Sequence, residues 1–204
     1  MPLRKQGARG VLFQVTLLAH GYTFVSKATT ARFVPELQHE ATIYERLQPL
    51  QGTHVPVFLG AVDLREVGRT YYYDIDVRII YLVLLSCGGR SLYDVEVSGE
   101  AKVQREVIQS VRALHLHGVI HTDVRDANVL WDEDAQRAMV IDFEQAVLVE
   151  RPRPVLAPIV PNKRSRQAGA DATNTTASKP RSRSDVIRFK MQEDILYAKL
   201  IFSS

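Results

Sequence analysis

The chain has 204 residues, a hydrophobic share of 46% and a formal net charge of +3. This length suits one domain, and the hydrophobic share is enough for a sizeable core. A single cysteine, Cys87, excludes an internal disulfide and fits a reducing compartment, and the sequence has neither a signal-peptide pattern nor an apolar run long enough to span a membrane. We therefore expect an intracellular protein, cytoplasmic or nuclear, without membrane association.

The first segment contains two closely spaced glycines before a β-prone run that extends to Leu18. Glycines allow backbone N–H groups to approach phosphates closely, so Gly7, Gly10 and Val11 are candidates for a phosphate-binding loop. The alternative is a flexible N-terminus, because only part of a glycine-rich loop is present. A complete strand before these glycines would barely fit, or is missing.

A strand and a helix follow. Residues 22–27 alternate and favour a β-strand that ends at Lys27, and residues 33–47 have the apolar spacing of an amphipathic helix. Glu40 lies on or beside the apolar face of that helix, where an unpaired carboxylate would be costly, so we expect it to pair with Lys27. Glu36 and Glu45 are the competing carboxylates, and a solvated lysine is the alternative for Lys27.

Two further apolar segments continue the pattern. Residues 79–85 form a continuous apolar run, typical of a strand buried on both faces, and residues 86–89 interrupt it. Residues 101–117 predict an amphipathic helix that stops at Gly118. His115 and His117 have no partners at metal-ligand spacing, so we interpret them as surface or helix-end residues rather than zinc ligands.

The most informative segment is 118–147. It places His121, Asp123 and Asn128 in one loop, and a predicted hairpin of residues 129–131 and 138–141 brings Asn128 near Asp142. Phosphoryl transfer from ATP needs a carboxylate that orients the attacking hydroxyl, and an amide with a second carboxylate that hold Mg²⁺. The alternative is ordinary loop residues, since Asp and Asn are common in turns.

These residues follow the pattern H-x-D-x-x-x-x-N with a later D-F, and from Gly7 to Leu148 the chain resembles the protein-kinase-like superfamily. The phrases H-E-A-T-I-Y-E-R-L, D-V-R-D-A-N-V-L-W and I-D-F-E-Q-A are more specifically similar to its fungal-type group. The resemblance implies an α+β, two-lobed fold with a small β-rich N-lobe and a reduced, mainly helical C-lobe. ATP would bind between the lobes.

The resemblance also implies roles for individual residues. Asp123 would be the catalytic base, Asn128 and Asp142 the magnesium ligands, and Lys27 with Glu40 the pair that holds the phosphates. Arg125 stands where a lysine near the transferred phosphate is common. The remaining nucleotide contacts would come from Gly7, Gly10, Val11, Leu85, Cys87 and Leu130, with Val11 and Leu130 on either side of the adenine.

Some positions depart from the family pattern. Thr122 replaces the usual Arg, which removes the link to a phosphorylated activation loop. Glu144 replaces a Gly, which restricts the turn after Asp142 and adds negative charge near the metal site. No A-P-E motif follows, and there is no room for the later helices of a full C-lobe.

We expect three segments: a kinase-like domain at 1–149 (lobes 1–86 and 87–149), a basic Pro/Ser-rich disordered segment at 150–184, and a helix at 185–204. The helix would dock through Ile187, Met191, Ile195, Leu196 and Leu200. The basic patch 163–166 resembles a nuclear-import signal, with a solvated linker as the alternative. Nucleic-acid binding is not expected, because interleaved aromatics are lacking.

The sequence therefore favours an ATP-dependent and Mg²⁺-dependent protein serine/threonine kinase. Two alternatives remain open: a pseudokinase that binds nucleotide or partners without turnover, and a small-molecule kinase of the aminoglycoside type. The sequence identifies neither the protein substrate nor the oligomeric state.

Overall fold

A computed structural model describes residues 2–7, 10–68, 70–73, 77–151 and 182–202. Within these ranges the chain has a mixed α+β fold, as expected. No helix in them combines the length and apolar character needed to cross a membrane. Most of the predicted disordered segment, including the basic patch 163–166, lies outside the described residues.

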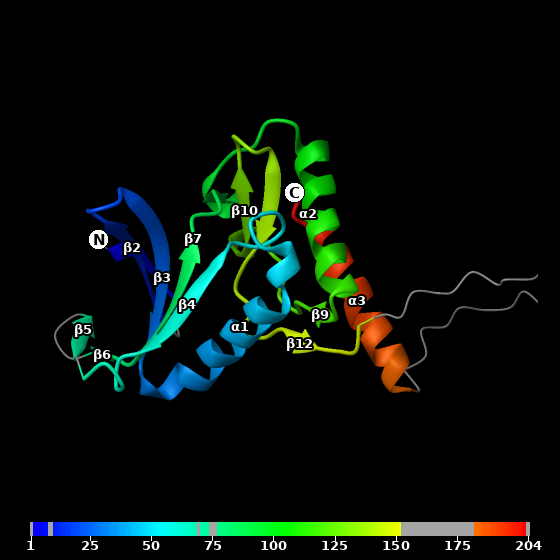
Figure 1. Cartoon of the computed structure of the whole chain (residues 1–204). Helices are drawn as coiled ribbons and strands as arrows, with labels where there is room; N and C mark the ends of the chain where they lie inside the picture. Colours follow the sequence, from blue (N-terminus) through cyan, green and yellow to red (C-terminus); the bar gives the residue numbers. More distant parts are fainter. Residues whose placement is uncertain (1, 8–9, 69, 74–76, 152–181, 203–204) are drawn as a thin grey trace, which may run out of the picture.

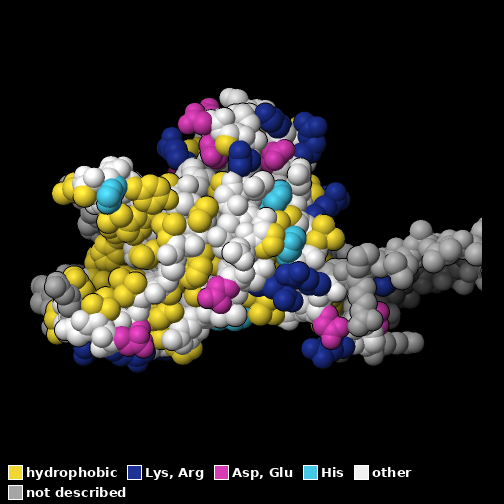
Figure 2. All heavy atoms as spheres, viewed as in Figure 1, with side chains coloured by type: hydrophobic (Ala, Val, Ile, Leu, Met, Phe, Trp, Pro, Cys, Tyr) yellow, Lys and Arg dark blue, Asp and Glu magenta, His cyan; other side chains and the backbone are white. Residues whose placement is uncertain are grey.

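A five-stranded antiparallel sheet forms one part of the molecule, in the order β1-β2-β3-β7-β4 (Figure 1). Its strands are β1 Pro2–Gly7, β2 Gly10–Leu17, β3 Tyr22–Thr29, β4 Phe58–Asp63 and β7 Tyr81–Ser86. Of the two expectations for the segment before the glycines, the strand that barely fits is confirmed, because β1 pairs with β2. Hydrophobic side chains gather over the β2–β3 end of the sheet (Figure 2), where Leu17, Leu18 and Tyr22 are exposed.

The predicted strand over residues 79–85 is confirmed for its larger part by β7, but a break at Ile80 separates β7 from the strand before it. β6 (Val77–Ile79) pairs with β5 (Tyr71–Tyr73) in a separate hairpin, and β7 begins after the break. The N–H of Ile80 donates to the carbonyl of Thr29. A small second core consists of Ala28 of β3, Leu64 directly after β4 and Ile79 of β6. Phe13 and Tyr73 pack against it.

Helix α1 (Val34–Arg46) lies beside this sheet and agrees with the predicted helix to within a residue at each end. A proline in its first turn, Pro35, suits a position that needs no backbone donor. Leu37, Ala41 and Tyr44 recur at helical spacing and are buried. Tyr44 stacks on Phe58 of β4, which fixes the helix against the sheet.

The second part of the molecule surrounds α2 (Glu100–Leu116), whose buried valines pack beside β11. Its strands are β8 Arg90–Ser91, β9 Val119–Ile120, β10 Val129–Asp132, β11 Arg137–Val140 and β12 Val147–Leu148. The predicted hairpin is confirmed, since β10 pairs with β11 and Val129 lies opposite Val140. The described residues also contain four short 3-10 helices: η1 Ala31–Phe33, η2 Gln48–Leu50, η3 Leu92–Asp94 and η4 Asp126–Asn128.

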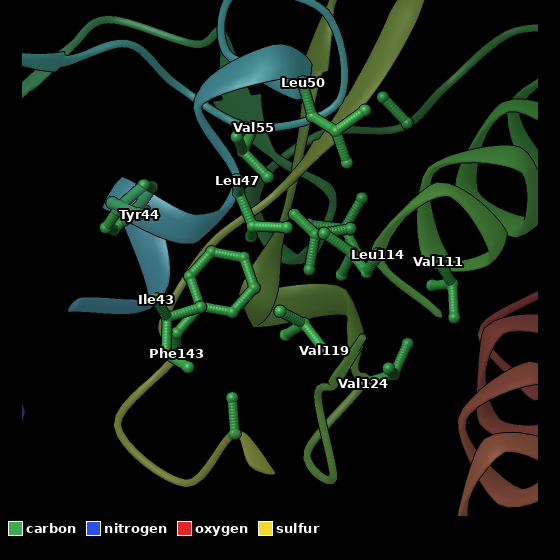
Figure 3. Packing of buried hydrophobic residues seen from close by; sticks show 14 of the residues in the cluster. Ile43, Tyr44, Leu47, Leu50, Val55, Val111, Leu114, Val119, Val124 and Phe143 are labelled. Atoms are coloured by element: carbon green, nitrogen blue, oxygen red, sulfur yellow. The ribbon is translucent and has the colours of Figure 1, made fainter. Parts of the chain in front are cut away.

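Phe143 connects these parts in one continuous core. Its fully buried ring lies among Ile43 and Leu47 of the α1 segment and Val119 of β9 (Figure 3). The ring meets Tyr44 edge-on, with 5.1 Å between centroids. Since burying a large apolar side chain contributes roughly 2–3 kcal/mol, Phe143 fixes the segment after Asp142 against α1.

Helix α3 (Arg183–Leu200) runs beside α2 (Figure 1), and the face predicted for docking is confirmed in part, because Ile195 packs against the core. Leu196 and Leu200 are 53% and 48% exposed, so their predicted role in docking is wrong. The buried residues of the helix are instead Asp194 and Ala198. A carboxylate therefore lies at the centre of the packed face.

Candidate functional site

Three carboxylates meet at the ammonium group of Lys27. Its Nζ lies 2.7 Å from Glu40 Oε2, 2.8 Å from Asp142 Oδ1 and 2.8 Å from Glu144 Oε1. The structure thus brings Lys27 of β3 together with Glu40 of α1. It does not bring the competing helix carboxylates there: Glu45 is exposed, and Glu36 has no bond to Lys27 among the described residues.

The electrostatics of this cluster follow from one ammonium facing three carboxylates. Burial alone would lower the pKa of Lys27, but the charges of Glu40, Asp142 and Glu144 outweigh it and raise that pKa. Burial raises the pKa of Glu40, and Lys27 offsets only part of the rise. Burial also acts to raise the pKa of Asp142, but Lys27 reverses this and lowers it. Lys27 is therefore a permanent cation in an excess of negative charge.

Glu40 also fixes the segment after the acidic residue of the D-F motif. Its second oxygen, Oε1, accepts a hydrogen bond from the backbone N–H of Phe143 at 3.4 Å, and its side chain is only 1% exposed. Asp142 itself has a left-handed backbone with φ 68°, which is unusual for a residue with a β-carbon. Helix α1 thus determines where the carboxylate of Asp142 points.

His121 anchors the loop that carries Asp123. Its ring is fully buried, Nδ1 accepts from the backbone N–H of Asp123 at 3.2 Å, and Nε2 lies 2.9 Å from the carbonyl of Ile141. With Nδ1 as an acceptor, Nε2 carries the proton and donates to that carbonyl. Burial lowers the pKa of His121, which favours this neutral tautomer.

Asn128 is bonded to the candidate catalytic carboxylate. Its Nδ2 donates to the backbone carbonyl and to Oδ2 of Asp123, both at 3.0 Å. The Nε of Arg125, 58% exposed, lies 3.4 Å from the same Oδ2. The N–H of Ile141 donates to the carbonyl of Asn128 at 3.0 Å, so the confirmed hairpin sets Asn128 beside the strand end that leads to Asp142.

Sequence reasoning missed Asp194, a residue on α3 that holds the same loop. Its carboxylate is 1% exposed and accepts hydrogen bonds from the backbone N–H groups of His121 at 2.8 Å and Thr122 at 2.9 Å. It also lies 3.0 Å from Nε2 of His115. The surface reading of His115 is therefore wrong. An acidic residue on the apolar face of the predicted helix was the available signal.

Thr122 connects the loop that carries Asp123 to the segment after the D-F motif. Its hydroxyl donates to the backbone carbonyl of Gln145 at 2.9 Å. Thr122 also has φ 66°, a strained value for a β-branched residue. The expected loss of a link to a phosphorylated activation loop stays a prediction, because this hydrogen bond joins the loop to a backbone carbonyl and not to a phosphate group.

The glycine segment forms the turn end of the β1–β2 hairpin, where Gly7 lies opposite Gly10. A β-carbon at Gly10 would lie 2.8 Å from the carbonyl oxygen of Ala28, so this position needs glycine for close packing as well. Val11 lies opposite Ala28, whereas Leu12 lies opposite Lys27. Directly opposed residues share a face. The prediction that Val11 covers the ligand is therefore wrong, and Leu12 occupies that face.

The other predicted nucleotide contacts lie around the segment that leaves β7. Leu85 is buried and lies opposite Val25, on the same face as Lys27. Cys87 follows it, exposed, with Sγ 3.6 Å from the carbonyl of Thr23. A β-carbon at Gly88 would lie 3.0 Å from Leu130 Cδ1, so the chain passes directly over Leu130.

The oxygen atoms at this site suit a hard divalent cation. Carboxylate oxygens of Glu40, Asp142 and Glu144 lie within 4.8 Å of one another. Lys27 bonds to all of them, and their excess negative charge favours a further cation. The side-chain oxygen of Asn128 also remains as an acceptor, since its amide nitrogen donates to Asp123. The donor set therefore fits Mg²⁺, which prefers oxygen ligands.

Comparison with known proteins gives an independent line of evidence. Residues 75–155 match the model of the RIO domain family. Over 154 residues the chain is 38% identical to the meiotic driver SPOK2 of Podospora anserina, covering 74% of this chain. It is 23% identical over 154 residues to calcium-dependent protein kinase 21 of Arabidopsis thaliana, covering 71% of this chain.

A third relative, calcium-dependent protein kinase 3 of Oryza sativa subsp. japonica, is 29% identical over 126 residues, 57% of this chain. The chain spans 18%, 28% and 20% of these three relatives, so each contains much that has no counterpart here. The shared part includes the Asp123 loop and the D-F motif in the RIO match. The chain therefore belongs to the protein-kinase-like superfamily.

Proposed function

We propose that this chain is an ATP-dependent protein serine/threonine kinase in which the β1–β7 sheet with α1 forms an N-lobe (1–86) and residues 87–149 a C-lobe. One observation carries the proposal: Lys27 Nζ bonds at once to Glu40 and Asp142, so that side chains from three different segments meet. A lysine that only balanced a buried glutamate would not need the carboxylate of the D-F motif.

Each residue then has a defined task. Asp123 orients the substrate hydroxyl through Oδ1, because Oδ2 already accepts from Asn128 and lies near Arg125. Arg125 contributes a positive charge beside it. Lys27, oriented by Glu40, would bind the phosphates of ATP, while Asn128 and Asp142 would hold Mg²⁺. ATP would supply the phosphoryl group, and Mg²⁺ would neutralise the negative charge of the phosphates.

The nucleotide base would lie against the inner face of the sheet and the segment after β7. Leu85, Cys87 and Leu130 stay candidates for this contact. Leu12 is a candidate in place of Val11, because it lies opposite Lys27. Gly7 and Gly10 would form the turn over the phosphates. This arrangement uses ATP and Mg²⁺ as cofactors and leaves Asp123 facing the substrate.

Thermal unfolding tests the nucleotide site. Mg-ATP should raise the melting temperature of the wild-type chain, because a ligand that binds only the folded state stabilises it. Asp142→Asn should abolish the magnesium-dependent part of that rise. Asp123→Asn should keep the rise and lose phosphoryl transfer to a protein substrate. A well-folded chain that Mg-ATP does not stabilise would contradict the proposal.

A specific contact favours a second candidate, a pseudokinase. Glu144 Oε1 lies 2.8 Å from Lys27 Nζ, so a third carboxylate competes with phosphate for the ammonium group. In that case the chain would bind nucleotide or a partner without turnover. Sustained phosphate release that depends on Asp123 would exclude this candidate.

A further inference from the structure

Helix α3 carries apolar side chains on two sides, and only one side packs against the rest of the described chain. Ala198 is buried there beside Asp194, and Ile195 packs against the core. On the other side, five large apolar side chains are 38–53% exposed: Val186, Phe189, Leu196, Tyr197 and Leu200. A helix with apolar residues on more than one side is normally covered on each of them. The exposed side of α3 is therefore a docking surface.

The exposed residues form one line along the helix, which we call the α3 stripe. They follow each other at steps of three or four residues, with a single gap of seven between Phe189 and Leu196. Residues at such steps share one face of a helix. From Val186 to Leu200 the stripe is roughly 21 Å long at 1.5 Å per residue. Figure 1 shows α3 at the end of the molecule away from the five-stranded sheet, so the stripe is separate from the site around Lys27.

The charges beside the α3 stripe indicate a second copy of the same helix as its partner. Asp185, Gln192 and Lys199 are exposed and recur every seven residues, so they form a row along one edge of the stripe. In two antiparallel copies centred on Gln192, Asp185 of each copy meets Lys199 of the other. A parallel pair would instead place like charges against each other. Because such flanking pairs set helix orientation, the row favours the antiparallel arrangement.

The apolar residues fit the same arrangement. Val186 and Phe189, at the N-terminal end of the stripe, meet Leu196 and Leu200 of the other copy, at its C-terminal end. Glu193 lies in the gap between the two apolar groups and is half-buried already. Antiparallel packing brings it within reach of Lys190 of the other copy, so its carboxylate is not left as an unpaired charge in the interface.

We infer that two copies of this chain associate through antiparallel packing of their α3 stripes, related by a two-fold axis near Gln192. The stripe is smaller than a standard interface of about 800 Å² per partner, so we expect a Kd in the micromolar range. The carboxylate of Asp194, on the same helix, accepts hydrogen bonds from the loop that carries Asp123. Association therefore supports that loop from behind, whether or not the chain transfers phosphate.

Sedimentation equilibrium of the full chain tests the association. The wild type should change from monomer to dimer between about 1 and 500 μM. Phe189→Asp should weaken the dimer at least about tenfold, because it places a carboxylate in the apolar contact. Leu18→Asp makes the same kind of change at an apolar residue that is 93% exposed beyond β2, and it should dimerise like the wild type. A wild-type chain that stays monomeric, or equal dimers of both variants, would overturn the inference.

Cysteine cross-linking in a Cys87→Ser background tests the geometry. Gln192→Cys should form a disulfide between two copies under mild oxidation, because the two sulfur atoms meet at the two-fold axis. Asp185→Cys alone should not, since positions 185 of the two copies lie about 21 Å apart. An equal mixture of Asp185→Cys and Lys199→Cys should form the mixed disulfide. Cross-linking of Asp185→Cys alone as readily as Gln192→Cys would contradict antiparallel packing.

Other occupants of the α3 stripe would give different results. Residues 154–160 (P-V-L-A-P-I-V) are an apolar run of the same chain. If they covered the stripe, the full chain would stay monomeric, and Val155→Cys would form a disulfide with Phe189→Cys inside one copy. If the stripe served a different protein, the chain would stay monomeric without that internal disulfide. Either result would overturn the inference and leave the proposed kinase function untouched.

Discussion

The backbone N–H of Thr122 donates to Oδ1 of Asp194 at 2.9 Å, although the two residues lie 72 positions apart in the sequence. The neighbouring N–H of His121 donates to Oδ2 of the same carboxylate. Thr122 has a left-handed backbone that its β-branched side chain disfavours. A buried carboxylate on α3 therefore holds the loop of Asp123 in a conformation that the loop would not adopt alone.

Replacing Asp194 should destabilise the whole domain. Asp194→Ala leaves two backbone N–H groups and the ring of His115 without their acceptor, which should cost roughly 3 kcal/mol or more. Urea unfolding monitored by circular dichroism measures this loss. Because the loop also loses its support, Asp194→Ala should impair transfer even where enough folded protein remains.

Neighbouring and conservative variants give the control for this prediction. Asp194→Asn keeps one acceptor oxygen and should lose less stability than Asp194→Ala. Glu193→Gln changes the same charge one position away and should lie within about 0.5 kcal/mol of the wild type. If Asp194→Ala were as stable as Glu193→Gln, α3 would not support the loop in solution.

A second prediction concerns the hydroxyl of Thr122. Thr122→Val removes the bond to the carbonyl of Gln145 and keeps the β-branch in a strained backbone, whereas Thr122→Ser keeps the hydroxyl without the branch. The Val variant should be less stable than the Ser variant by about 1 kcal/mol in urea unfolding. Equal stabilities would mean that this hydrogen bond contributes nothing to the fold.

Short-range patterns predicted much of the fold because each needs only local information. The apolar spacing of α1 placed Glu40 toward the buried side, and the hairpin placed Asn128 beside Asp142. The H-x-D and D-F motifs identified Asp123 and Asp142 without any knowledge of tertiary structure. The RIO-domain match over residues 75–155 includes both motifs.

The errors have physical causes that local patterns do not contain. Local sequence does not tell which face Val11 occupies, because a one-residue shift in a strand exchanges its two faces, and only pairing with β3 fixes the register. Asp194 was missed because its partners lie far away in sequence, so its helix was interpreted by hydrophobicity alone. The continuous apolar run ending at Leu85 gives no local sign of the break at Ile80. There the N–H of Ile80 donates to Thr29 of β3, and its carbonyl accepts from the N–H of Leu64.

A third prediction gives the site a pH dependence. In Lys27→Met, Glu40 loses the cation that partly offsets its burial, so its raised pKa should rise further. A carboxyl that is neutral when folded and ionised when unfolded loses stability as pH rises above its unfolded pKa. The variant should therefore be much less stable than wild type near pH 8, by roughly 3 kcal/mol, and closer to it near pH 5.

Urea unfolding across this pH range measures the effect. Lys102→Met, which removes an exposed lysine that bonds to Gln136, is the matched control and should show no comparable pH dependence. A Lys27→Met loss that is the same at both pH values would mean that Glu40 stays ionised without Lys27. Both outcomes are independent of whether the chain transfers phosphate.

The fourth prediction tests Glu144, which contacts Lys27. The kinase pattern D-F-G has a glycine at this position. If the chain is an active kinase, the charge of Glu144 attracts Mg²⁺, and Glu144→Gln should need roughly threefold to tenfold more Mg²⁺ for the same ATP-dependent rise in melting temperature. Glu133→Gln, in the exposed turn after β10, should behave like wild type.

If Glu144 instead blocks Lys27, as in a pseudokinase, Glu144→Gln should tighten ATP binding without any gain in transfer. A titration of Mg²⁺ at fixed ATP therefore separates the two functions by the direction of the shift.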